Sequence, residues 1–126
     1  MDFNQHVGIR VVRRHRNGVT IECRLREELH NMAGVLHGGV TATLVDVAAG
    51  MAIMHRGRVA TTVELKVNYL RSVTGHKVTA RSRLLRIGKT LVTAQVDVFD
   101  DHRNHAAVAI VTYMLLDVRS REQSSR

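Results

Sequence analysis

Asp46 is the one ionisable side chain in the segment 38–54, which otherwise consists of glycine, alanine, threonine and larger apolar residues. Burying a carboxylate in such surroundings costs free energy unless the group has a partner or a function. One interpretation is a structural ion pair between Asp46 and an arginine on a neighbouring strand. The other is a general base or nucleophile that acts on a bound substrate. On this segment alone, both interpretations stay open.

The loop that precedes this segment carries groups suited to binding an oxyanion. Asn31 and His37 lead into the glycine pair Gly38-Gly39. Two glycines let a ligand approach the backbone, and the free N–H groups at a helix start stabilise a developing negative charge. The Asn31 amide adds a second donor, whereas His37 by itself is more often a structural histidine than a catalyst. The pattern predicts a carbonyl-activating site at residues 31–39.

The spacing of the two groups has a geometric consequence. Gly38 and Asp46 are eight residues apart on what is predicted to be one helix, which places them about 12 Å apart along its axis. One substrate carbonyl cannot contact both groups of the same chain. If both act on one carbon, they come from different subunits whose helices pack antiparallel across a two-fold axis. The spacing therefore predicts an obligate dimer with two composite sites.

The same residues form a motif, Asn-x-x-Gly-x-x-His-Gly-Gly followed by an aspartate nine residues after the histidine. In this chain the motif residues are Asn31, Gly34, His37, Gly38, Gly39 and Asp46. This motif resembles that of hotdog-fold thioesterases of the phenylacetate-pathway (PaaI-like) type. The resemblance continues through the segments 7–9, 68–71, 86–89 and 107–113, and so covers nearly the whole chain.

The resemblance implies an α+β hotdog fold, in which a curved antiparallel sheet wraps one long central helix. It implies hydrolysis of an aromatic or medium-chain acyl-coenzyme A thioester by a homodimer or homotetramer, with coenzyme A as part of the substrate and no separate cofactor or metal. Asn31 and the Gly38 N–H would polarise the thioester carbonyl next to His37. Asp46 of the facing subunit would activate water or attack the carbonyl directly.

Further site residues follow from the same resemblance. In some members a hydroxyl on the strand after the helix helps to place the water, and Thr62 matches that position, with Thr61 as the adjacent alternative. Cationic side chains at strand ends and turns would contact the phosphates of coenzyme A; these are Arg71, Arg86 and Lys89. The acyl group would lie against Val40, Leu44 and Met51.

The elements that must position these residues can be read from periodicity and turn signals. Alternation of apolar and polar residues predicts strands at 8–14 and 19–25, with a hairpin at Asn17-Gly18 between them. Segment 38–54 predicts a helix, and because it is apolar nearly all round, we expect it to be buried within the sheet. Four more strands are predicted at 61–71, 77–87, 90–100 and 105–118. The last of these is apolar on both faces, which favours a central place in the sheet.

Length and composition limit the classes of protein that fit. The chain has 126 residues, enough for one domain, which we assign to residues 1–118, with a polar tail at 119–126 that is expected to be disordered. Cys23 is the single cysteine, so no intrachain disulfide can form, and the N-terminus lacks the features of a signal peptide. We therefore expect a cytoplasmic protein. Asp46 in the middle of the apolar segment argues against a membrane span.

The net charge of +8 suits a polyanionic partner, such as a phosphorylated substrate or an acidic carrier protein. Aromatic residues make up only 3% of the chain, which leaves few platforms for stacking bases, so no nucleic acid is expected. The segment 100–105 gathers aspartate and histidine, but hairpin turns favour such residues and the spacing forms no closed metal site. Two alternatives stay open: an acyl-thioester hydratase or dehydratase that uses His37 with Asp46, and a non-catalytic module that binds acyl-coenzyme A or nucleic acid.

Overall fold

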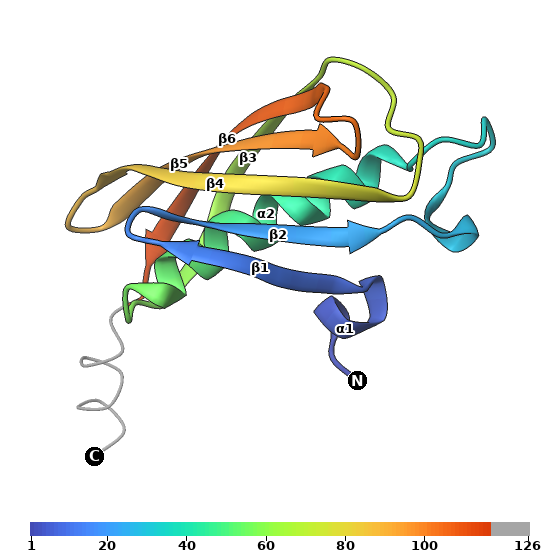
Figure 1. Ribbon diagram of the computed structural model, residues 1–126. Coiled ribbons are helices and arrows are strands. Elements are labelled where there is room, and N and C mark those ends of the chain that lie inside the picture. Colours follow the sequence, from blue (N-terminus) through green and yellow to red (C-terminus); the bar gives the residue numbers. More distant parts are fainter. Residues whose placement is uncertain (117–126) are drawn as a thin grey trace.

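The computed structural model describes residues 1–116, which form one sheet and one long helix (Figure 1). The predicted tail 119–126 and the predicted domain end at residue 118 lie outside this described part. In chain order the elements are α1 (Phe3–Val7), β1 (Ile9–His15), β2 (Gly18–Arg24), a 3-10 turn (Glu27–Leu29), α2 (Gly38–His55), β3 (Ala60–Tyr69), β4 (Lys77–Ile87), β5 (Leu91–Asp100) and β6 (His105–Leu115). The strands lie in the order β1-β2-β4-β5-β6-β3, and every neighbouring pair is antiparallel.

The predicted α+β architecture and the predicted order of elements are confirmed. The helix extends one residue beyond its expected end, and β4 has the expected bounds. The turn between β1 and β2 falls at Arg16 and Asn17, and Gly18 already pairs with His15. Position 18 must be glycine, because a Cβ there would lie 1.8 Å from the carbonyl oxygen of Ser82. The last strand lies between β5 and β3, inside the sheet as predicted.

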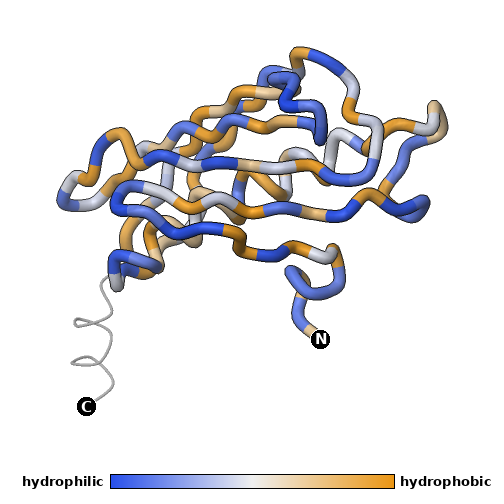
Figure 2. Tube along the Cα trace, viewed as in Figure 1, coloured by the Kyte–Doolittle hydropathy of each residue, from blue (hydrophilic) through white to orange (hydrophobic). Residues whose placement is uncertain are grey.

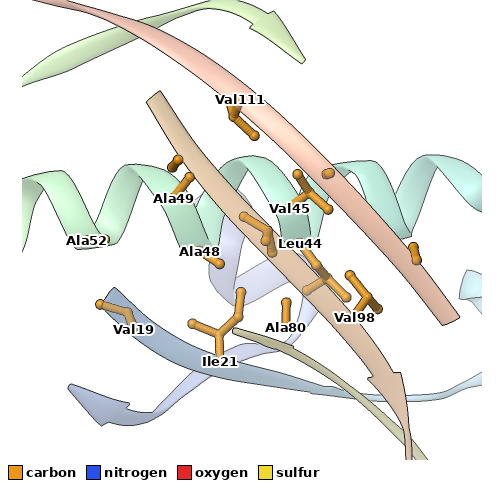
Figure 3. Close-up of a cluster of buried hydrophobic side chains, with 14 of the residues drawn as sticks. Val19, Ile21, Leu44, Val45, Ala48, Ala49, Ala52, Ala80, Val98 and Val111 are labelled. Atoms are coloured by element: carbon orange, nitrogen blue, oxygen red, sulfur yellow. The ribbon is translucent and has the colours of Figure 1, made fainter. Parts of the chain in front are cut away.

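The hydrophobic core lies between α2 and one face of the sheet (Figure 3). The helix contributes Thr41, Leu44, Val45, Ala48, Ala49, Ala52 and Ile53. Along the strands hydrophobic and hydrophilic residues alternate, so that one face packs on the helix and the other meets solvent (Figure 2). Ser82 is fully buried, and its hydroxyl lies 2.7 Å from the carbonyl oxygen of Ala48, which joins β4 to α2.

The predicted burial of α2 within the sheet applies to one face of the helix. Only the face that packs on the sheet is buried, while Gly39, Thr43, Asp46, Gly50 and Met54 lie on an outer face that is half-buried or exposed. The outer residues are small or apolar, apart from Asp46 and the threonine, so the periodicity of the helix is weak. The helix has the length and hydropathy of a membrane span, but its inner face is occupied by the core of this domain.

Strand β3 forms one edge of the sheet and departs from regular pairing at Val63. Thr62 pairs with Tyr113 of β6, and the next pair is Glu64 with Thr112, so Val63 is an extra residue on β3. An extra residue of this kind reverses which residues face the core on one side of the bulge. Thr62 therefore faces the helix together with Tyr113.

Candidate active site

The start of α2 leaves one backbone donor free. His37 is the N-cap, and its Nδ1 atom accepts the N–H of Gly39 at 2.9 Å. The carbonyl oxygen of His37 accepts the N–H of Val40. Over residues 1–116, the N–H of Gly38 makes no hydrogen bond to the protein. It is therefore available to a carbonyl oxygen, as the sequence predicts for an oxyanion site.

His37 itself is a structural residue in this geometry. An imidazole nitrogen that accepts a hydrogen bond carries no proton, so the contact with Gly39 assigns the proton of the neutral ring to Nε2. The hydratase alternative needs His37 to act with Asp46 on one substrate carbon. The ring caps the helix start, and Asp46 lies nine residues further along α2, so within one chain the two groups do not meet, and that alternative would need Asp46 from a second subunit.

Asn31 is held so that its amide nitrogen is free. Its Oδ1 atom accepts the N–H groups of Ala33 and Val35, at 2.9 and 3.3 Å. These contacts identify Oδ1 as the acceptor and leave the Nδ2 donors without a protein partner in the described part of the chain. Asn31 and Gly38 line one pocket of about 340 Å³, together with Tyr69 and Arg71. The structure thus brings both predicted donors to one cavity.

Tyr69 fixes the position of the helix start from the end of β3. Its hydroxyl donates to the carbonyl oxygen of Gly38 at 2.6 Å. A side chain at position 38 would lie 3.4 Å from that hydroxyl, so glycine lets the ring lie against the backbone. The periodicity of β3 gave no sign of this contact, because the contact joins residues 31 positions apart.

The second group of site residues surrounds Asp46 on the outer face of α2. The Thr62 hydroxyl donates to Asp46 Oδ1 at 2.7 Å, and the Tyr113 hydroxyl lies 2.7 Å from the same oxygen. The Tyr113 hydroxyl also lies within hydrogen-bond distance of the main-chain oxygen of Asp46. Oδ2 accepts no hydrogen bond from any side chain or backbone group of residues 1–116.

These contacts argue against the first of the two interpretations of Asp46. No arginine lies within ion-pair distance of its carboxylate in the described residues, so the structural ion pair is wrong. Thr62, and not Thr61, is the threonine that reaches the carboxylate. One oxygen is anchored by hydroxyl donors and the other is open, which is the arrangement that a general base or a nucleophile requires.

Tyr113 was not predicted from the sequence. Burial raises the pKa of its hydroxyl above the usual range, and the hydrogen bond to Asp46 and the charge of that carboxylate raise it further, against smaller opposing effects of Thr62 and the Gly50 backbone. The hydroxyl therefore stays protonated at ordinary pH and has a proton to donate to Asp46. The sequence does contain one sign of its role: Tyr113 is a tyrosine among alanines and valines on the buried face of the last strand.

The two groups of residues lie far apart within one chain. Helix α2 is continuous from Gly38 to His55, so the axial separation of about 12 Å between Gly38 and Asp46 holds. The pocket that contains Asn31 and Gly38 includes neither Asp46 nor Thr62. A single chain therefore keeps the carbonyl donors and the carboxylate in two separate places.

The residues predicted for binding the substrate are distributed unevenly. Arg71 lines the pocket of Asn31, whereas Arg86 and Lys89 belong to the β4–β5 hairpin, which lies at the opposite end of the molecule from the start of α2 (Figure 1). Leu44 is fully buried against the sheet (Figure 3), so its assignment to an acyl pocket is wrong and it belongs to the core. Val40 and Met51 are half-buried and stay predictions.

The segment 100–105 forms a hairpin turn, as the turn interpretation predicts. Asp100 Oδ1 accepts the backbone N–H groups of His102 and Asn104, and Oδ2 accepts the Asn104 amide. The Asn104 amide lowers the pKa of Asp100, and the two backbone donors act in the same direction. Both carboxylate oxygens are thus used to stabilise the turn.

Comparison with known proteins identifies the family. A model described as "Thioesterase superfamily" matches residues 33–107, which is more than half of the chain. The chain belongs to this superfamily. The matched range includes Gly38, Asp46, Thr62 and Arg71, while Asn31 and Tyr113 lie just outside it. Thioester hydrolysis, predicted from the sequence, is confirmed as the class of activity.

Individual relatives of this thioesterase support the assignment. The chain is 31% identical over 133 residues to the Escherichia coli protein named medium/long-chain acyl-CoA thioesterase YigI. The alignment covers 91% of this chain and 86% of the relative. Thioesterase HI1161 from Haemophilus influenzae superposes with a TM-score of 0.86 at 23% identity, over 91% of this chain and 82% of that one. A Streptococcus pneumoniae thioesterase protein solved with coenzyme A has a TM-score of 0.82 at 20% identity, over 86% of each chain. The two structures establish the shared hotdog fold.

Proposed function

We propose that this thioesterase hydrolyses acyl-coenzyme A thioesters at composite sites, each shared between two subunits. The observation that carries the proposal is the separation of two half-sites along one helix. One half-site holds the unpartnered N–H of Gly38 and the unpartnered amide of Asn31. The other holds Asp46 with one oxygen anchored and the other open. Two chains with antiparallel α2 helices would bring opposite halves together.

The proposed reaction uses the groups of both halves. The thioester carbonyl oxygen accepts hydrogen bonds from Gly38 and Asn31, which stabilise the negative charge of the tetrahedral intermediate. Oδ2 of Asp46 from the facing subunit either takes a proton from a water that attacks the carbonyl, or attacks the carbonyl itself. In the first route the carbon–sulfur bond then breaks, the proton taken from the water passes to the departing thiolate, and the free acid is released. In the second route breakage of the carbon–sulfur bond leaves a mixed anhydride on Asp46; water hydrolyses this anhydride, which releases the acid, restores the carboxylate and supplies the proton for the thiolate. This chemistry needs no metal or redox cofactor.

Coenzyme A as the thiol half of the substrate is supported by charge and by relatives. The chain carries a net charge of +8, and Arg71 lines the pocket of the two carbonyl donors. Guanidinium groups bind phosphate in a bidentate geometry. The E. coli relative is named for medium- and long-chain acyl-coenzyme A, and we propose a medium-chain acyl group here, with aromatic esters as the comparison. A PaaI-like specificity and a cytoplasmic location stay predictions.

Exposed apolar surface supports association through β3 and the outer face of α2. Val63 on the edge strand and Met54 on the helix are large apolar side chains that lie more than half exposed. An unprotected edge strand is a template for pairing with another chain. Val63 follows Thr62 in the chain, and Met54 lies on the same outer face of α2 as Asp46, so a contact between subunits along this face would cover the Asp46 half-site. We propose a dimer as the minimum unit, from which a tetramer could be assembled.

Subunit mixing tests the composite site directly. Asp46→Asn and Asn31→Ala each remove one half-site, so each homodimer should be inactive. After unfolding and refolding together in equal amounts, half of the dimers combine the two variants, and each of these holds one intact site. We expect recovery of about a quarter of the wild-type activity. If each chain formed its own complete site, the mixture would stay inactive, and this result would exclude the composite site.

A further inference from the structure

Tyr113 has a feature that packing does not explain. Its side chain is only 3% exposed and continues the inner face of β6, after Ala107, Ala109 and Val111. A phenylalanine would fill the same space without a polar group to satisfy. The hydroxyl instead lies 2.7 Å from Asp46 Oδ1, and the main-chain oxygen of Asp46 is also within its reach.

The hydrogen bond from Tyr113 to Asp46 comes from the interior of the sheet, where packing fixes the side chains. Thr62, the other donor to Oδ1, lies on the edge strand β3, which has a neighbouring strand on one side only within the chain. Tyr113 lies on an interior strand, and its ring is fixed by the surrounding core. The terminal torsion of an aspartate is broad and has no strongly preferred value. A buried donor on one oxygen therefore decides the plane of the carboxylate.

We propose that Tyr113 is a positioning residue that orients the Asp46 carboxylate for thioester hydrolysis, an inference that rests on the proposed role of Asp46. By donating to Oδ1, Tyr113 directs Oδ2 toward the water or the carbonyl carbon. Among the titratable side chains of residues 1–116, Tyr113 is the only one that makes a hydrogen bond or ion pair with this carboxylate.

The first test is Tyr113→Phe, which removes the hydroxyl and keeps the ring. A hydrogen bond to a charged group is worth about 1.5–3 kcal/mol, so kcat is expected to fall roughly ten- to a hundredfold. KM should change little, because the ring does not line the pocket of Asn31 and Gly38. A purely structural role would lower the midpoint of thermal unfolding and leave kcat per folded molecule in place.

Thr112→Val is the matched control. Thr112 is the neighbour of Tyr113 on β6 and faces the other side of the sheet, so this variant should keep the wild-type kcat and KM. If Tyr113→Phe also kept both, the positioning role would be refuted. Asp46→Asn separates this outcome from a failure of the proposed function. If Asp46→Asn is inactive and Tyr113→Phe behaves as wild type, only the inference on Tyr113 fails; if Asp46→Asn is fully active, the proposed function fails.

A second measurement uses the wild-type side chain. The chain has two tyrosines, so protein labelled with carbon-13 at tyrosine Cζ gives two signals, which Tyr69→Phe assigns. In Asp46→Asn the Tyr113 signal should shift, because the charged acceptor is gone, while the Tyr69 signal should not. An unchanged Tyr113 signal would show that the hydroxyl does not bind the carboxylate, and would overturn the inference even if Tyr113→Phe failed to fold.

Discussion

Replacing Thr62 with valine would remove one donor from Asp46 and keep the shape of the side chain. The lost hydrogen bond, of 2.7 Å, runs from the Thr62 hydroxyl to Oδ1 of the carboxylate. Valine has a strand propensity close to that of threonine, so β3 should form normally. The perturbation is thus limited to one donor next to the proposed base.

The expected loss can be worked from the environment of Thr62. Hydrogen bonds to charged groups contribute about 1.5–3 kcal/mol. The Tyr113 hydroxyl still contacts Oδ1 in this variant, so the carboxylate keeps one donor and the lower end of this range applies. Since about 1.4 kcal/mol corresponds to a factor of ten, kcat/KM for Thr62→Val should fall about tenfold. The midpoint of thermal unfolding should change little.

The assay is release of free thiol from acyl-coenzyme A, followed with a thiol-reactive dye. Cys23 is buried, so the protein itself adds little background. Thr61→Val is the matched control: it is the same substitution on the adjacent residue, which pairs with Met114 and does not reach Asp46. Equal losses in the two variants, or full activity in Thr62→Val, would refute the assignment of Thr62 as a donor to the base.

Two further predictions concern stability. Leu44→Ala leaves a cavity in the core between α2 and the sheet. The free energy of unfolding, measured in guanidinium chloride, should therefore fall by about 2–5 kcal/mol. A fall of less than about 1 kcal/mol would show that the surrounding side chains move in to fill the space, and would contradict a tightly packed position for Leu44. The pKa of Tyr113 is raised in the folded protein. The resulting contribution to the free energy of unfolding is fully present below the pKa of an unfolded tyrosine, about 10, and is lost as the pH rises above that value. Unfolding titrations between pH 9 and about 11 should therefore show stability falling more steeply in wild type than in Tyr113→Phe, by up to about 1.4 kcal/mol per pH unit; equal slopes would contradict the raised pKa.

The sequence predicts the elements well and the contacts between distant elements poorly. Glycine and asparagine turns, together with alternating strands, locate the hairpins, because these signals are local. The choice between Thr61 and Thr62 is different. Counting back from the inward residues Leu65 and Val67 in steps of two leads to Thr61. The extra residue at Val63 shifts the alternation by one position, so that Thr62 faces the helix and contacts Asp46. Periodicity contains no sign of that bulge, and the resemblance to a family supplied the correct residue.

The contacts of Tyr113 and the placement of the arginines show the same limit. Tyr113 and Asp46 are 67 residues apart, and only the pairing of β6 inside the sheet brings them together. Arg71 and Arg86 both end strands, and that similarity suggested a shared function. The antiparallel path of β3 and β4 places them at opposite ends of the molecule. For such residues, topology decides the neighbours, and no local pattern encodes it.

Because α2 carries one half-site at its start and the other two turns later, insertions and deletions should be tolerated very unevenly along this chain. One residue added between Gly38 and Asp46 would rotate the carboxylate by about 100° around the helix, away from Thr62 and Tyr113. A loop absorbs the same change by bending. Divergence of substrate range within this architecture should therefore proceed through changes of length in the segments 30–36 and 70–76, which border the pocket of Asn31, while the interval between the two half-sites keeps its length.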